Sequence, residues 1–327
     1  MSDEIRTARS IKPVWQAVVA LSLLVCYAAF SSAVGAAGVE RRAITIWSDG
    51  TRMAADLWLP AGSGDGVKRP AILLTHGWGG ERSHLNNTYA PKFANAGFVV
   101  LAFDYRGWAD SDSRLVIIGD QPRPDENGEV TVRARAIREV VDPHDQVRDI
   151  TSALDYLAGE PGVDVDRIGI WGTSYSGGHV IVVGARDKRV AAIVSQVGYQ
   201  GVGWTPERRR FADQRATDKA RGVIDPIPQG IDVVPNLRGT PDLAKMADYR
   251  PIDSAQDVRV PTLVIDVTGE DLFDRMKNGH AVYEILQNNV QAEYRTFPGK
   301  HYGIYNQHYP AASSLALDWF RRYLMQQ

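Results

Sequence analysis

Short apolar segments alternate with helix-like segments from about residue 41 to the end of the chain. Brief, continuously apolar runs are typical of parallel strands buried on both faces. The alternation predicts an α/β fold with a mostly parallel eight-stranded sheet and helices on both faces. We expect strands at 43–47, 55–59, 71–75, 99–103, 168–171, 191–195, 262–267 and 292–297, and helices at 89–96, 144–157, 176–185, 276–286 and 312–325.

Two segments interrupt this alternation. Residues 111–141 are polar and rich in turn-forming residues, and residues 199–250 are broken by five prolines. We interpret both as insertions in one domain that spans residues 38–327. The second insertion follows strand six and precedes strand seven, where such domains carry caps, so it predicts a lid over the binding site rather than a decorative loop.

The first 37 residues have the pattern of a secretory signal peptide. Arg6, Arg9 and Lys12 precede a long uncharged stretch that ends in the small residues SSAVGAAG. Cleavage near Ala37 would give a secreted or periplasmic protein. The alternative is an uncleaved membrane anchor, because the uncharged stretch is long enough to span a bilayer. The single cysteine, Cys26, lies in this segment, so the mature protein would contain no disulfide.

Composition narrows the possible partners. The formal net charge is -2 and 44% of the residues are hydrophobic, which is typical of a globular protein with a large core. Nucleic acid is not expected as a partner, because phosphate binding requires concentrated Lys and Arg. Cysteine and histidine spacings typical of zinc sites are lacking, so we expect no metal and no cofactor. Composition does not predict the oligomeric state.

The segment GIWGTSYSGGHV, residues 169–180, joins an expected strand to an expected helix through small residues. A serine on such a sharp turn is exposed enough to act as a nucleophile, and this predicts that role for Ser174. Gly172 and Ser176 flank it at the two positions where strand and helix pack too closely for large side chains. The backbone N–H of Tyr175, at the start of the helix, is expected to bind the oxyanion. Ser176 departs from the usual GxSxG pattern.

A second glycine-rich segment, HGWGG, follows the third expected strand at residues 76–80. The backbone amide of Trp78 is the candidate for the second oxyanion donor. The alternative is an ordinary glycine turn with His76 in a structural role.

The catalytic base should follow the acid in the chain order of this architecture. Candidates are His280, His301 and His308. His280 falls in a helical pattern and His308 lies further along, beside a proline. His301 lies in FPGKHYGIY, just past the last strand, which favours it as the base.

The acid is expected in DVTGEDLFD, directly after the seventh strand. Asp266 falls within the strand, and Asp274 is placed to cap the following helix. Glu270 and Asp271 therefore remain as alternatives for the residue that orients the imidazole.

These motifs resemble those of the α/β-hydrolase superfamily from about residue 39 to the end of the chain. HGWGG, FDYRG and GTSYSGG are similar to the dienelactone-hydrolase-like, cocaine-esterase-like and X-prolyl dipeptidyl-peptidase branch, with a weaker likeness to fungal polyketide transferases. The resemblance implies a catalytic triad of Ser174, Glu270 and His301, with the oxyanion bound by Trp78 and Tyr175.

The sequence thus predicts a secreted serine hydrolase that cleaves small-molecule carboxylic esters through an acyl-enzyme. Three alternatives stay open: an acyltransferase on the same triad, a peptidase or lactonase, and a non-catalytic binding protein with a dead site. The natural substrate and the acyl acceptor are not predicted.

Overall fold

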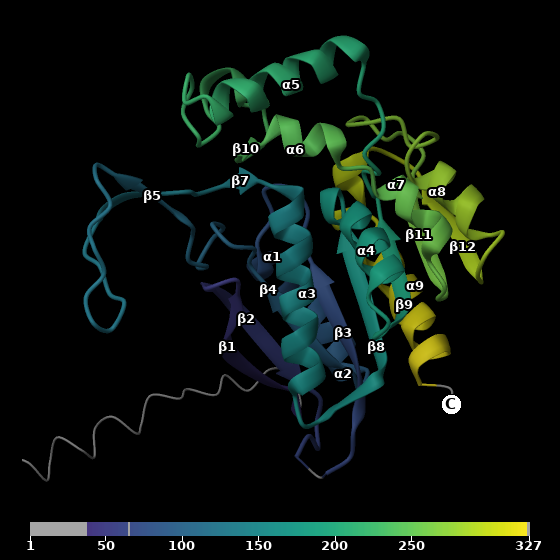
Figure 1. The fold of residues 1–327 in the computed structure, drawn as a ribbon. Coiled ribbons are helices and arrows are strands. Elements are labelled where there is room, and N and C mark those ends of the chain that lie inside the picture. The colour runs from purple at the N-terminus through teal and green to yellow at the C-terminus, as the bar shows by residue number, and fades with distance from the viewer. Residues whose placement is uncertain (1–37, 65, 326–327) are drawn as a thin grey trace, which may run out of the picture. The chain divides into compact units, whose positions relative to one another are not determined.

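The computed structural model describes residues 38–64 and 66–325. A central sheet of eight strands is covered by helices (Figure 1). The strand order is β1-β2-β4-β3-β8-β9-β11-β12. Strand β2 is antiparallel to both of its neighbours, and the remaining pairs are parallel. The predicted fold class and all eight strands are confirmed. Their bounds are β1 (Glu40–Ser48), β2 (Thr51–Leu59), β3 (Arg69–Thr75), β4 (Val99–Phe103), β8 (Val163–Thr173), β9 (Val190–Gln196), β11 (Thr262–Val267) and β12 (Ala292–Phe297).

Helices cover both faces of the sheet, which explains why the inner strands are continuously apolar. In β3, Leu73 packs into one core while Ile72 and Leu74 pack into the other, and all three are fully buried. The first core is covered by α3 (Pro143–Gly159), α4 (Tyr175–Arg186) and α8 (Gly279–Leu286), and the second by α1 (Arg82–Asn86), α2 (Tyr89–Asn95) and α9 (Tyr309–Leu324).

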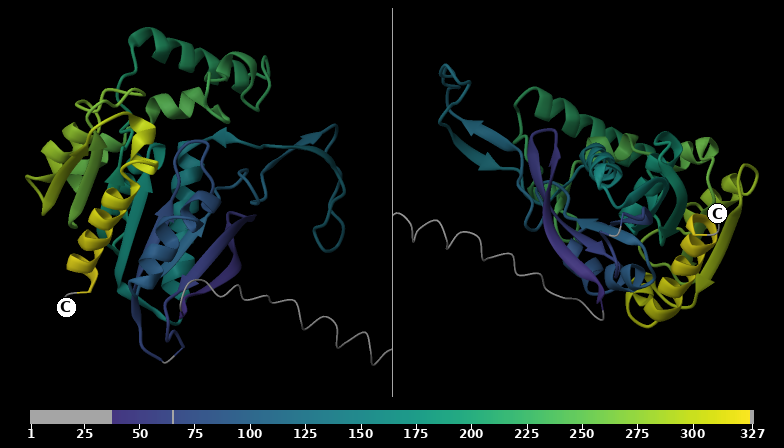
Figure 2. Two further views of the ribbon diagram at one scale, coloured as in Figure 1. Left: turned by 180° about the vertical axis from the view of Figure 1, so that it is seen from behind. Right: turned by 90° about the horizontal axis from the view of Figure 1, so that it is seen from below.

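The two predicted insertions contain structure that the sequence did not reveal. The first forms a hairpin of β5 (Leu115–Ile118) and β6 (Arg133–Ala136), which extends away from the central sheet in both views of Figure 2, and then β7 (Val140–Val141). The second, residues 199–250, which we call the cap, contains α5 (Pro206–Ala220), a 3-10 turn at Gly230–Asp232, β10 (Thr240–Pro241) and α6 (Leu243–Asp248). Helix α7 (Pro251–Ser254) and a 3-10 turn at Ala255–Asp257 follow the cap and lead to β11.

The two insertions are joined to each other. Strands β7 and β10 form a short parallel pair. The guanidinium of Arg135 in the hairpin donates two hydrogen bonds to the carboxylate of Asp225 in the cap, at 2.6 and 2.9 Å. Arg238 of the cap donates to Glu139, which precedes β7, at 2.6 Å. The two insertions therefore contact each other through a strand pair and through ion pairs, and form one structural unit.

The predicted signal peptide, residues 1–37, lies outside the described residues. Within residues 38–64 and 66–325, none of the helices combines the length and the apolar character that a membrane crossing requires.

Candidate active site

Ser174 occupies a strained turn between β8 and α4. Its backbone angles are φ 55° and ψ -123°, a conformation that residues other than glycine rarely adopt. The turn is held because the Ser174 N–H donates to the Gln196 carbonyl at 2.8 Å and the Ser174 carbonyl accepts from Gly177 N–H at 2.9 Å. The predicted serine-bearing elbow is thus present at the end of a central strand.

The small residues around Ser174 are required by close backbone approach. A Cβ added at Gly172 would lie 2.4 Å from the carbonyl oxygen of Ser176, which is impossible without moving the helix. A Cβ added at Gly77 would lie 2.6 Å from the Cβ of Ser174. The HGWGG loop therefore packs directly against the serine, as a loop that supplies an oxyanion donor must.

His301 lies between Ser174 and Glu270 and contacts both. It begins a 3-10 turn (His301–Tyr305) that follows β12. Its Nε2 lies 3.1 Å from the Ser174 Oγ, and its Nδ1 lies 2.7 Å from the Glu270 Oε2. The side chains of His301 and Glu270 are almost fully buried. With Nδ1–H donating to the carboxylate, Nε2 is the ring nitrogen that faces the Ser174 hydroxyl as a hydrogen-bond acceptor.

Asp271 also contacts His301, but through the backbone. Its Oδ1 accepts from the His301 N–H at 3.2 Å, and this bond lowers the pKa of the Asp271 carboxyl. The Lys300 ammonium lies 3.3 Å from its other oxygen. Of the two neighbouring acids, Glu270 contacts the imidazole ring and Asp271 holds the loop that carries it.

The other histidines and acids considered from the sequence lie elsewhere. The His280 Nε2 lies 3.6 Å from Glu284 on α8, and the His308 ring packs against Phe297. Asp274 does not cap α8, because that helix begins only at Gly279; the Asp274 carboxylate instead accepts from the Met276 N–H at 3.0 Å within a turn.

Asp266 is buried at the end of β11 and accepts from the Tyr294 hydroxyl at 2.8 Å. Burial raises the pKa of its carboxyl to about 7. The folded state therefore binds this proton more tightly than the unfolded state, in which the pKa is about 3.9. The stability contributed by the protonated group is complete below about pH 4 and is lost as the pH rises through 7.

Asp266→Asn should remove most of this pH dependence, because the amide stays uncharged. We expect the variant to gain up to about 4 kcal/mol of unfolding free energy at pH 8 relative to the parent, and little at pH 4. Urea unfolding between pH 4 and pH 8 measures this. Asp274→Asn, which replaces a half-exposed acid, is the matched control. It should leave the dependence of the unfolding free energy on pH the same as in the parent. If the unfolding free energies of the parent and of Asp266→Asn changed equally between pH 4 and pH 8, the prediction would be wrong.

Trp78 and Tyr175, the residues predicted to donate to the oxyanion, both lie in the segments that pack next to Ser174. Tyr175 is the first residue of α4, so its N–H is one of the free amides at that helix N-terminus. Trp78 follows Gly77, and its indole ring packs edge-on against the Tyr175 ring with centroids 5.8 Å apart. Both residues line the same cavity as Ser174.

Arg238, which was not predicted as a site residue from the sequence, connects the cap to the HGWGG loop. Its backbone carbonyl accepts from the Trp78 indole N–H at 2.8 Å. Its guanidinium forms ion pairs with Glu81, next to that loop, and with Glu139. No local signal could have revealed this, because Trp78 and Arg238 are 160 residues apart.

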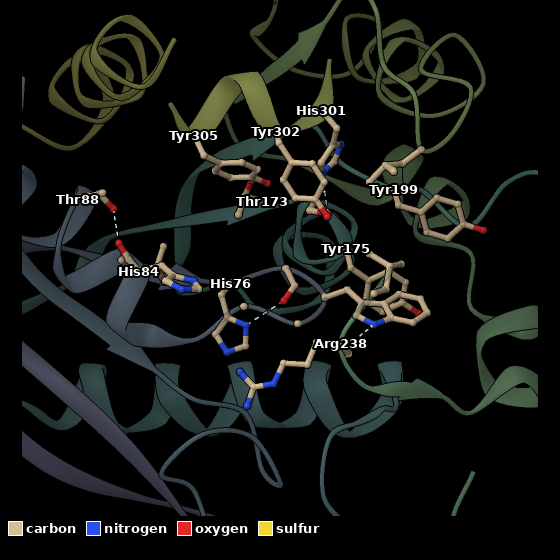
Figure 3. A pocket seen from close by; sticks show the side chains of 18 of the residues that line it. His76, His84, Thr88, Thr173, Tyr175, Tyr199, Arg238, His301, Tyr302 and Tyr305 are labelled. Atoms are coloured by element: carbon tan, nitrogen blue, oxygen red, sulfur yellow. Dashed lines mark hydrogen bonds between the residues drawn. The ribbon is translucent and has the colours of Figure 1, made fainter. Parts of the chain in front are cut away.

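Ser174 opens into a cavity of about 740 Å³ that the cap helps to line (Figure 3). His84 and Thr88 lie on one side of it, Tyr175 and Tyr199 lie on the other, and Tyr305 lies next to Tyr302. Among the described residues that line the cavity there is no Asp or Glu, and the one Arg or Lys is Arg238, whose charge is neutralised by its two ion pairs. In the described part of the chain, no three or more Cys, His, Asp or Glu side chains are grouped to hold a metal.

The sheet order and the serine-bearing elbow together define the molecule as a serine hydrolase with the α/β-hydrolase fold. A family model described as X-Pro dipeptidyl-peptidase (S15 family) matches residues 49–215. The chain belongs to this family.

The chain is also similar to individual bacterial proteins. The chain is 28% identical over 288 residues to an uncharacterized 31.7 kDa protein in the traX-finO intergenic region of Escherichia coli, covering 79% of this chain and 92% of that protein. It is 34% identical over 130 residues to the quorum-quenching protein AidA of Acinetobacter baumannii (strain MDR-ZJ06), covering 40% of this chain and 36% of that protein.

Solved structures with low sequence identity share the fold. Hypothetical protein PA2218 from Pseudomonas aeruginosa matches with a TM-score of 0.66 and 22% identity, covering 88% of this chain and 95% of that chain. Est1E from Butyrivibrio proteoclasticus, solved with ferulic acid bound, matches with a TM-score of 0.62 and 17% identity, covering 86% of this chain and all of that chain.

Proposed function

We propose that the protein hydrolyses uncharged carboxylic esters through an acyl-enzyme formed on Ser174. The observation that carries this proposal is the continuous pair of contacts from the Ser174 Oγ to His301 and from His301 to Glu270, at 3.1 and 2.7 Å, on a strained elbow. Such strain persists where function requires it, which argues against a binding protein with a dead site.

In the proposed mechanism, the Ser174 Oγ attacks the ester carbonyl carbon while its proton passes to the His301 Nε2. The negative charge that develops on the carbonyl oxygen accepts hydrogen bonds from the Trp78 and Tyr175 amides. The alcohol then leaves with the proton from His301, and the acyl group remains on Ser174. Water attacks this acyl-enzyme by the same route and releases the acid. The Glu270 carboxylate orients the imidazole and stabilises the imidazolium.

The lining of the cavity favours an uncharged substrate. A dipeptidyl-peptidase must bind the free ammonium group of its substrate, and a buried ammonium needs a carboxylate or similar partner. The described lining supplies no Asp or Glu side chain for this purpose, and the charge of Arg238 is already paired. The volume of about 740 Å³ is within the range of sites for small organic molecules. These features support a small neutral ester over an X-Pro dipeptide.

A substrate panel tests the proposal. Hydrolysis of p-nitrophenyl acetate, butyrate and hexanoate should be compared with hydrolysis of alanyl-prolyl-p-nitroanilide, which carries a free amino terminus. We expect turnover of the esters and none of the anilide. Product analysis with added methanol separates transfer from hydrolysis, since a transferase would form mostly the methyl ester. Faster cleavage of the dipeptide anilide would contradict the proposal.

A further inference from the structure

Ser176, the residue at which the elbow departs from GxSxG, uses its hydroxyl in a buried chain of hydrogen bonds. The Ser176 Oγ donates to the Thr75 Oγ1 at 2.6 Å, and the Thr75 hydroxyl donates to the Trp171 carbonyl at 3.1 Å. The Tyr105 hydroxyl lies 3.0 Å from the Ser176 Oγ. Ser176 and Thr75 are fully buried, and Tyr105 nearly so.

The direction of these bonds follows from proton counting. A carbonyl oxygen can only accept, so the Thr75 hydroxyl donates its proton to the Trp171 carbonyl. The Ser176 hydroxyl therefore donates its proton to the Thr75 Oγ1. The Tyr105 hydroxyl must then donate to Ser176. Each hydroxyl in the chain donates once, and each bond is strengthened by the low dielectric of the interior.

This chain joins the two backbone segments that carry the proposed oxyanion donors. Thr75 is the last residue of β3 and lies three residues before Trp78. Ser176 directly follows Tyr175 in the first turn of α4. The Tyr105 ring also packs against the His76 ring, with centroids 4.6 Å apart. The hydrogen-bonded side chains therefore also contact the first residue of the HGWGG loop. A glycine at position 176 could make none of these side-chain bonds.

We infer that Ser176 is a positioning residue whose hydroxyl fixes the spacing between the Trp78 and Tyr175 amides. The inference rests on the proposed function, because it assigns those amides to the oxyanion. Oxyanion stabilisation depends on donors that are held in place before the reaction, within about 0.5 Å of their working geometry. A direct bond between the two donor segments meets that requirement, whereas a small apolar residue would only fill the space.

Ser176→Ala and Thr75→Val, singly and combined, test this. Because the oxyanion exists only in the transition state, each single variant should lower kcat about tenfold while KM stays within about twofold. The double variant should lose no more than the worse single variant, since both break the same bond. Inhibition by phenylboronic acid, which becomes tetrahedral when Ser174 adds to it, should weaken by a factor similar to the loss in kcat.

Ser152→Ala is the matched control. Ser152 is a buried serine on α3 that donates to the Ser48 Oγ at 3.1 Å and is not among the residues that line the cavity. It should lower Tm about as much as Ser176→Ala and leave kcat unchanged. The inference is overturned if Ser176→Ala and Thr75→Val behave like this control, with kcat and boronic acid inhibition unaltered, or if their losses in kcat simply add. Either result would leave the proposed function intact, provided that the parent hydrolyses esters and Ser174→Ala does not.

Discussion

Ser174→Ala should lower kcat for p-nitrophenyl acetate by about 10⁶-fold, as expected when the nucleophile of a serine hydrolase is removed. Of the described side chains around the cavity, only this hydroxyl contacts the His301 Nε2, so no other group can form the acyl-enzyme. Folding should be retained, because alanine is smaller and α4 keeps its backbone bonds. Steady-state kinetics together with circular dichroism and Tm measure both effects.

A fluorophosphonate reagent gives an independent check of the nucleophile. Mass spectrometry of the labelled parent should find the adduct on Ser174, and the Ser174→Ala variant should take up no label. Ser176 serves as the internal comparison, since it is two residues away and its hydroxyl is fully buried. An adduct on Ser176 alone, or an active protein without any adduct, would refute the assignment of Ser174.

Glu270→Gln should lower kcat by about 10⁴-fold, as replacement of the acid by its amide does in related triads. The amide cannot hold the imidazole in the tautomer that leaves Nε2 free, and it does not stabilise the imidazolium. Asp271→Asn is the matched control, because Asp271 is the neighbouring acid and contacts His301 through the backbone N–H rather than through the ring. It should cost less than about tenfold in kcat.

Kinetics of both variants beside His301→Ala distinguish the two acids, and Tm measurements exclude unfolding as the cause. If Asp271→Asn lowered kcat more than Glu270→Gln, the role of the triad acid would be assigned to Asp271 instead. Ser174 and His301 would keep their proposed roles.

The sheet and the elbow could be predicted because their signals are local. The apolar run in β3 reflects burial on both faces, and the spacing of Gly172, Ser174 and Ser176 reflects the close packing of one strand on one helix. His301 could be placed because it follows the last strand. The choice between Glu270 and Asp271 needed the structure, since both acids touch His301 and only the geometry shows which one reaches the ring.

The position of the cap could be predicted, but its internal structure and the bonds that support the site could not. Helix α5 shows little apolar periodicity, because Ala212 is its one buried residue, so its sequence resembles a polar loop. The contact between Trp78 and Arg238 joins residues that are far apart in the chain and has no local pattern. At position 176 the sequence required only a small residue, and it gave no sign that the hydroxyl reaches Thr75.

The joined insertions have a consequence for protein engineering. A chimera that received the cap of a relative without its first insertion would leave Arg135 and Glu139 without Asp225 and Arg238. The strand pair β7–β10 would also lose one member. We therefore expect a grafted cap to keep its contacts only when both insertions are transferred together, even though more than fifty residues of the sheet and its helices separate them in the chain.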